Sequence, residues 1–156
     1  DVNNAYDEGP FSIDRTGGLP LRALINLCFC GKYDKKQVQE MFMKKGGIIA
    51  YLNTNDGRVF EDMVTAGDKK AEMVMHGLCH QVCKEIGGMS TVLRGRVDAI
   101  VLTGGLARFK KLVELIKERV SFISKVLVFG GEDELASMAA GAYRVLSGQE
   151  KAKTLE

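Results

Sequence analysis

The chain has 156 residues, of which 46% are hydrophobic and 27% are charged, and its formal net charge at pH 7 is +2. This composition is typical of one globular domain with a sizeable core, and so small a charge does not favour a nucleic-acid-binding protein. No apolar run is long enough to cross a bilayer, and the four cysteines have no extracellular context, so we expect a cytoplasmic protein with reduced thiols.

The first twenty residues predict an irregular segment, because they are rich in Gly, Pro, Asp and Asn. The chain opens without methionine, and we expect its first residue, Asp1, to be a truncation point in a longer protein. Arg15 lies in this segment, between Asp14 and a Gly-Gly-Leu-Pro stretch. Its guanidinium either binds a phosphate or carboxylate ligand through paired hydrogen bonds, or pairs with Asp14 or Asp7 at the surface.

Two helices are expected between Pro20 and the Gly46-Gly47 pair. Pro20 suits the first turn of the first helix, whose apolar residues have helical spacing, and Gly31 would end it. Asp34 and Gln37 have the spacing of a capping box, which predicts the start of the second helix.

A short apolar piece at residues 48–52 leads into a turn-prone stretch at residues 53–57. Another helix is expected after this turn and before Gly67. Asp56 is a candidate N-cap for that helix. Alternatively, Asp56 leaves Arg58 free to meet a ligand.

The longest helix is expected from about residue 68 to about residue 93. Histidines and cysteines at positions 76, 79, 80 and 83 share one face of it, which raises the alternative of a zinc site. A single helix cannot direct four ligands to one tetrahedral ion, and cysteine also packs well in apolar surroundings, so we favour packing. The apolar residues at helical spacing predict a buried face made of Met75, Leu78, Val82, Ile86, Met89 and Leu93.

The last part of the chain predicts a β-α-β-α unit, with a right-handed crossover if its two strands are parallel. Its elements are expected at residues 97–102, 107–119, 126–129 and 133–146. The remaining residues, 149–156, are expected to be a frayed tail, and the final Leu-Glu a cloning remnant.

Two glycine pairs follow the predicted strands of this unit. Gly104-Gly105 either present backbone N–H groups to a nucleotide or make a tight strand-to-helix turn. Gly130-Gly131 precede three acidic residues at 132–134, which either favour the first turn of a helix or hold Mg²⁺. The sequence contains neither a P-loop nor a Gly-x-Ser-x-Gly elbow, so a nucleotide would need another scaffold.

Taken in order, these motifs resemble the acetokinase family of short-chain acid kinases, and its butyrate-specific branch in particular. The resemblance is carried by residues 1–5, 9–12, 15–20, 46–47, 50–52, 54–56, 97–107, 116–123 and 131–135. It covers nearly the whole chain but only about the C-terminal half of the family's enzymes. It implies an α/β fold: a helix-rich, ribonuclease H-like and actin-like ATPase lobe over residues 1–148, closed by the β-α-β-α unit.

The resemblance implies an enzyme that transfers the γ-phosphoryl of ATP, with Mg²⁺, to a short-chain carboxylate and forms an acyl phosphate and ADP reversibly. Butyrate is the expected acid; acetate, propionate or a branched-chain acid is the alternative, as is a non-catalytic nucleotide-binding module. The implied partners are an N-terminal lobe and further copies of the full-length enzyme, and no nucleic acid or membrane is expected. Because the first phosphate-binding segment would lie before Asp1, this chain alone is expected to be inactive.

The resemblance also assigns roles to individual residues. Arg15 is the implied catalytic residue that contacts the transferring phosphoryl. The implied adenosine contacts are Asp56, Gly57 and Arg58, and the implied loop beneath the nucleotide is Gly104, Gly105, Leu106, Ala107, Arg108 and Phe109. Asp133 is the implied magnesium carboxylate, with Glu132 or Glu134 as alternatives.

Two departures from the family pattern bear on this site. Arg108-Phe109 replace an expected Tyr-Asn or Tyr-Asp, so the adenosine loop is expected to be altered. The loop at residues 7–9 is one residue shorter than the family's Asp-Gly-Glu-Gly.

Overall fold

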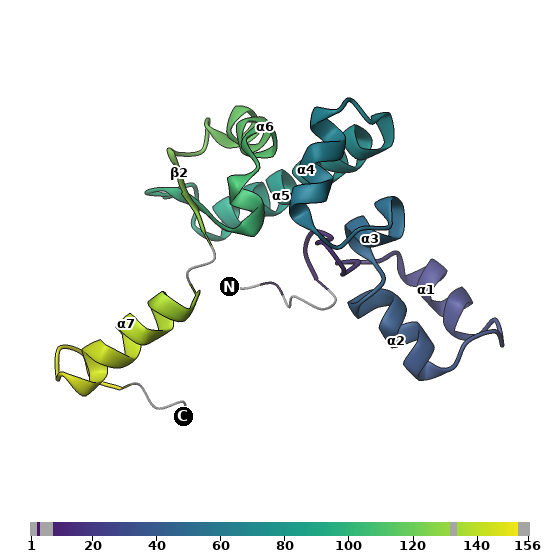
Figure 1. Cartoon of the computed structure of the whole chain (residues 1–156), viewed down its shortest axis with the longest axis horizontal. Helices are drawn as coiled ribbons and strands as arrows, with labels where there is room; N and C mark the ends of the chain where they lie inside the picture. Colours follow the sequence, from purple (N-terminus) through teal and green to yellow (C-terminus); the bar gives the residue numbers. More distant parts are fainter. Residues whose placement is uncertain (1–2, 4–7, 132–133, 153–156) are drawn as a thin grey trace.

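The computed structural model describes residue 3 and residues 8–131 and 134–152 of the chain. These residues form seven α-helices, one 3₁₀ helix and two strands (Figure 1). In chain order they are α1 (Leu21–Cys28), α2 (Lys35–Met43), α3 (Gly47–Leu52), α4 (Gly57–Thr65), α5 (Lys69–Val92), β1 (Ile100–Gly104), the 3₁₀ helix η1 (Gly105–Arg108), α6 (Lys110–Val120), β2 (Val126–Gly130) and α7 (Glu134–Leu146). No helix in these ranges combines the length and apolar character needed to cross a membrane.

The core forms around α5, which packs against α3, α4 and α6. Of its predicted face, Met75 and Leu78 are buried, while Val82 and Ile86 are partly buried against the core. Leu93 is 53% exposed, so its predicted burial is wrong: α5 ends at Val92 and Leu93 is its C-cap. The buried cluster is Ile48, Phe60, Val64, Ala71, Val74, Met75, Leu78, Cys79, Ile100, Phe109, Leu112, Ile116 and Val120.

The two strands are parallel, as a β-α-β unit requires, with α6 between them in the chain. Their register pairs Ile100 with Val126 and Gly104 with Gly130. The first strand begins at residue 100 rather than at the expected residue 97, because pairing with β2 starts only there. The expected helix from 107 is also corrected: Phe109 has extended backbone angles (φ −73°, ψ 94°), which separate η1 from α6.

The irregular segment before α1 is fastened to the start of α3 by backbone hydrogen bonds. The amides of Ile48 and Ile49 donate to the carbonyls of Ser12 and Ile13, both at 2.9 Å. Gly47 permits this close approach, because it has a φ of +59° and a Cβ there would collide with the Ser12 carbonyl oxygen. The apolar piece at 48–52, whose conformation the sequence left open, is therefore a helix that anchors a loop.

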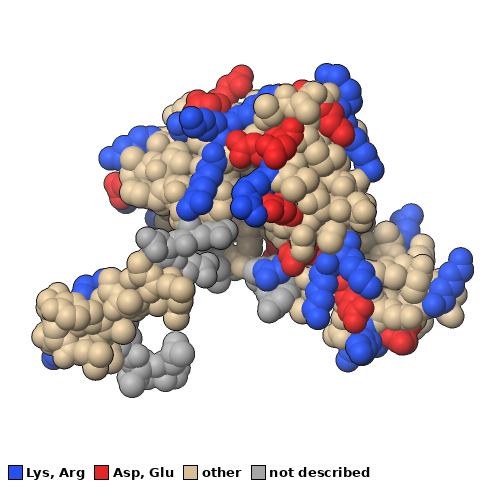
Figure 2. Space-filling view, viewed as in Figure 1, with Lys and Arg blue, Asp and Glu red and all other residues tan. Residues whose placement is uncertain are grey.

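The two ends of the chain carry helices whose apolar side chains remain exposed. Helix α7 stands apart from the body of the molecule (Figure 1), and its surface is mostly uncharged, whereas basic and acidic side chains are interspersed over the rest (Figure 2). Leu135 and Leu146 of α7 are 84% and 86% exposed. Leu21 and Ile25 of α1 are likewise exposed, so the expected apolar face of α1 lies at the surface. The expected tail falls partly outside the described residues.

Candidate functional site

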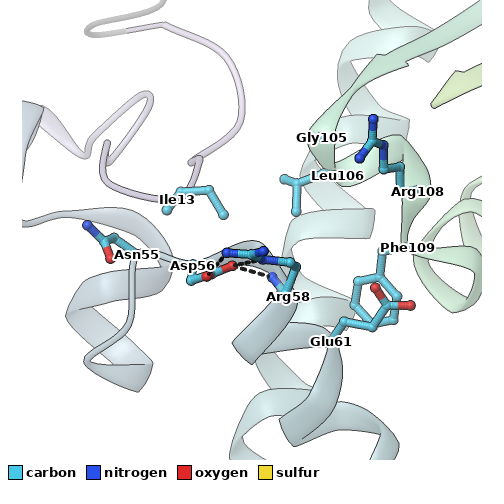
Figure 3. A pocket seen from close by; sticks show the side chains of 10 residues that line it. Ile13, Asn55, Asp56, Arg58, Glu61, Gly105, Leu106, Arg108 and Phe109 are labelled. Carbon is cyan, nitrogen blue, oxygen red and sulfur yellow. Dashed lines mark hydrogen bonds and ion pairs between the residues drawn. The ribbon is translucent and has the colours of Figure 1, made fainter. Parts of the chain in front are cut away.

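A cavity of about 700 Å³ opens between the N-terminal end of α4 and the loop that joins β1 to α6 (Figure 3). Most of the residues that the sequence singled out for a nucleotide meet there. The cavity is lined by Ile13, Asn55, Asp56, Gly57, Arg58, Glu61, Gly105, Leu106, Arg108 and Phe109. Gly104 and Ala107 belong to the same loop but do not line the wall, and Arg15 does not line it either.

The α4 wall is organised by Asp56, which is the N-cap of that helix, as predicted. Its carboxylate accepts a hydrogen bond from the Arg58 backbone N–H at 2.8 Å and from the Arg58 side chain through Nε at 3.1 Å and Nη2 at 2.7 Å. These hydrogen bonds lower the pKa of Asp56 to about 2 and raise that of Arg58. The Arg58 side chain is therefore paired with Asp56 in the structure, and the alternative of an unpaired Arg58 is not observed.

The opposite wall begins where β1 ends. Gly104 adopts φ +84° and ψ −178°, a conformation available essentially only to glycine, and the chain turns there directly into η1. At the other end of η1, Phe109 is 3% exposed and its ring meets the Phe60 ring edge-on, with centroids 5.6 Å apart. The loop is thus fixed by a glycine at one end and an aromatic anchor at the other.

The second glycine pair makes room for this loop. A Cβ on Gly130 would lie 3.1 Å from the Ala107 carbonyl oxygen and 3.2 Å from Cγ of Arg108. The loop therefore packs directly against the backbone at the end of β2. The tight strand-to-helix turn that the sequence offered is therefore present, and the residues that follow it form one wall of the cavity.

Arg15 lies in the loop fastened to α3. Its Nε is 3.9 Å from Oδ1 of Asp14, and the two side chains are 37% and 46% exposed, so the predicted surface ion pair is present. Its own carbonyl oxygen accepts a hydrogen bond from the Ser12 amide at 3.0 Å.

The expected magnesium ligands Glu132 and Asp133 lie outside the described residues, and Glu134 is the first residue of α7. Among the described side chains, no group of three or more His, Cys, Asp or Glu is arranged to hold a metal ion.

The cysteines of α5 pack in the interior. Cys79 is fully buried, and its Sγ lies 3.9 Å from that of Cys83. Burial, together with the neighbouring Cys79 thiol, raises the pKa of Cys83 to about 11. His76 and His80 are exposed, and Cys28 and Cys30 are exposed near the end of α1, so the favoured packing role of the α5 cysteines agrees with their positions.

Three lining residues escaped the sequence analysis. Glu61 is one helical turn beyond Arg58 on α4, and Asn55 directly precedes Asp56, so both were within reach of a motif-based argument. Ile13 reaches the cavity only because its loop is bonded to α3, and no local pattern signals this contact. The cavity has the volume of ordinary small-molecule sites and combines apolar walls with a few charged groups.

Comparison with known proteins gives a consistent result. The model of the Acetokinase family matches residues 15–151. Butyrate kinase 1 of Clostridium acetobutylicum is 49% identical over 154 residues, which are 98% of this chain and 43% of that protein. Probable butyrate kinase 2 of Caldanaerobacter subterraneus subsp. tengcongensis is 45% identical over 153 residues, again 43% of its length. The chain thus spans less than half the length of these relatives.

Solved structures with the same fold include two acetate kinases. That of Porphyromonas gingivalis superposes with a TM-score of 0.76 at 20% identity, covering 89% of this chain and 41% of the other. That of Entamoeba histolytica gives a TM-score of 0.72 at 17% identity, covering 87% and 43%. These likenesses confirm the expected fold class, a helix-rich α/β lobe with a small parallel sheet.

Proposed function

This chain belongs to the acetokinase family, and we propose that it forms the nucleotide-binding, C-terminal part of a butyrate kinase. The observation that carries the proposal is the meeting of two sequence-distant motifs, residues 56–58 and 105–109, in one cavity. That cavity lies beside the ends of two parallel strands, where α/β proteins bind ligands. The identity to butyrate kinases over nearly the whole chain supports the choice of acid.

The residues of the cavity fit an adenine nucleotide. Leu106, Ile13 and Phe109 line the cavity and offer apolar contact to a base, and η1 follows Gly104 directly. Charged side chains from both walls face the same space. Apolar walls with a few placed polar groups are the usual composition of a cofactor site.

The proposed reaction is transfer of the γ-phosphoryl of ATP to butyrate, with ADP and butyryl phosphate as products. Such a transfer depends on positioning and on charge stabilisation more than on covalent chemistry. Within this chain, Arg15 would bind the transferring phosphoryl group, and the 104–109 loop would hold the nucleotide in place.

Mg²⁺ would neutralise phosphate charge when bound, and Asp133 or Glu132 would hold it. Residues that the longer relatives have and this chain lacks would supply the other lobe and much of the acid pocket. We therefore propose that the chain is inactive alone and that the full-length enzyme associates with further copies of itself.

The test is an acyl hydroxamate assay on the full-length protein that contains this chain, with ATP, Mg²⁺ and a series of acids. Butyrate is expected to give the highest kcat/KM, with acetate, propionate and branched-chain acids below it. A folded protein that binds ADP but phosphorylates none of these acids would instead be a nucleotide-binding module. A preference for acetate or propionate would support the proposed kinase activity but change the proposed substrate.

Arg15→Ala gives the matched residue test in the same protein. It should lower kcat steeply while leaving the Kd for ADP nearly unchanged, because the contact is proposed to the transferring group alone. An unchanged kcat would remove Arg15 from the mechanism.

A further inference from the structure

Two charged side chains of the cavity make no hydrogen bond or ion pair with any residue that the structure describes. They are Glu61 on α4 and Arg108 at the end of η1. In contrast, Asp56 and Arg58 bind each other. Glu61 and Arg108 are therefore the charged groups of this cavity whose hydrogen-bonding capacity is unused within the described part of the chain.

Arg108 extends over the end of β2. Its Nη2 lies 3.7 Å from the position that a Cβ on Gly131 would occupy, and its Cγ lies against Gly130. Gly131 is bridged to Gly104, so the same place is also the end of β1. The guanidinium stands where anionic ligand groups collect in α/β proteins, and its planar fork suits a phosphate.

The backbone that carries Arg108 is anchored by the next residue. Phe109 is buried against Phe60, and its amide donates to the Leu106 carbonyl at 3.1 Å. An arginine attached to such an anchor loses less freedom on binding a ligand than one on a mobile loop. The family resemblance leads us to expect tyrosine at this position, whereas this chain has arginine.

Glu61 has the opposite preference. An ionised carboxylate only accepts hydrogen bonds, so it attracts hydroxyl and amino groups and repels phosphate. Glu61 is half-buried and comes from α4, whereas Arg108 comes from η1 (Figure 3). A ligand that satisfies both residues must carry an anionic group at one end and hydrogen-bond donors at the other.

We propose that Arg108 binds a phosphate group of the nucleotide and that Glu61 accepts a hydrogen bond from its nucleoside part. This assignment rests on the proposed nucleotide site and gives it a direction. The phosphates point to the ends of the strands, and the sugar or base lies against α4. Both are specificity-determining residues, and neither takes part in the transfer step.

The experiment is isothermal titration of the full-length protein with ADP and with adenosine, at constant Mg²⁺ and ionic strength. Arg108→Gln should weaken ADP binding about 10- to 100-fold, the effect of one charge-assisted contact, and leave adenosine within about twofold. Arg108→Lys should recover part of the ADP affinity. Arg22→Gln is the matched control, because Arg22 is exposed on α1 away from the cavity.

Glu61→Met should weaken ADP and adenosine by the same factor, about tenfold, because both contain the nucleoside. Glu118→Met, an exposed position on α6, is its control and should change neither. Thermal unfolding of every variant establishes whether it is folded. If Arg108→Gln does not fold, the ADP affinity of Arg108→Lys provides the measurement instead.

Two results would overturn the proposal while leaving the proposed function standing. One is an Arg108→Gln variant that binds ADP as tightly as the parent does. The other is an equal loss of ADP and adenosine affinity in that variant, which would place Arg108 on the base. A folded parent protein that binds neither ligand would instead refute the nucleotide site itself.

Discussion

The Asp56 carboxylate accepts hydrogen bonds from both the backbone and the side chain of Arg58. Its Oδ1 accepts from the Arg58 amide at 2.8 Å, and its Oδ2 accepts from Nη2 at 2.7 Å. The Asp56 carboxylate therefore caps the N-terminus of α4 and also positions the Arg58 guanidinium in the cavity wall. The same residue contributes to the stability of the fold and to the candidate site.

Removing the Asp56 carboxylate should affect both stability and binding. Asp56→Ala should lower the free energy of unfolding by about 1 kcal/mol, the usual cost of a lost N-cap, and should also weaken ADP binding. Asp68→Ala removes the cap of α5, outside the cavity, and should match the stability loss without the binding loss. Urea denaturation and ADP titration measure the two effects. Equal ADP affinities in both variants would show that Asp56 does not contribute to ADP binding.

The same carboxylate should make stability sensitive to acid. The pKa of Asp56 falls from 3.8 to about 2, chiefly through its hydrogen bonds to Arg58. A carboxyl group whose pKa is lowered by folding stabilises the folded state at pH values above its unfolded-state pKa. This contribution is lost as the pH falls from about 4 towards 2. Asp56→Asn should therefore show a flatter dependence of unfolding free energy on pH in that interval. Parallel curves for variant and parent would contradict this prediction.

Two glycines should respond to alanine in opposite directions. Gly104→Ala places a side chain at φ +84° and should lower the free energy of unfolding by about 1–3 kcal/mol. Gly88→Ala lies within α5 with nothing near its Cβ position, and should raise stability by about 0.5–1 kcal/mol. Chemical denaturation checks both signs, and a stabilised Gly104→Ala would refute the strained turn.

The aromatic anchor should be essential to the loop. Phe60→Ala removes a fully buried ring and should cost about 3–5 kcal/mol. Phe109→Asn restores one expected family residue, yet should cost at least as much, because it also buries an unpaired amide. Phe122→Ala is the control: its ring is 84% exposed, and its cost should stay within about 0.5 kcal/mol. A Phe109→Asn variant of parent stability would mean that the loop can repack.

The cysteines should divide into two reactivity classes. Cys28 and Cys30 are exposed, whereas Cys79 is buried and burial raises the pKa of Cys83 to about 11. Because the thiolate is the nucleophile, brief alkylation at pH 8 should modify the first pair and spare the second. Mass spectrometry of the peptides shows the pattern, and denatured protein should be labelled at all four cysteines. Early labelling of Cys83 would contradict its position beside Cys79 and the Ile116 carbonyl of α6.

Local patterns predicted most elements of this fold because their signals are short-range. The Asp34–Gln37 capping box is present as expected, with both of its hydrogen bonds formed, and Asp56 caps α4. The limits of β1 were missed because a strand begins where its partner begins, and that partner is distant in the sequence. Leu93 was misplaced because periodicity does not reveal where packing ends.

The cavity was predicted in part. Its two motifs are contiguous stretches that the family resemblance aligned, and the structure brings them together. Ile13 lines the cavity because of hydrogen bonds between two segments that are far apart in the chain. Neither the composition nor the residue spacing of either segment predicts these hydrogen bonds. The roles of Arg15, Asp133 and Glu132 stay predictions.

Gly104 and Gly130 are direct partners in the sheet, and neither has a Cβ. The end of the sheet under the loop is therefore bare backbone on both strands. A side chain at Gly130 would crowd the loop, whereas one at Gly104 would meet no atom within 4 Å and would strain only the backbone of the turn. One loop thus depends on two paired glycines for different reasons, space at Gly130 and backbone conformation at Gly104.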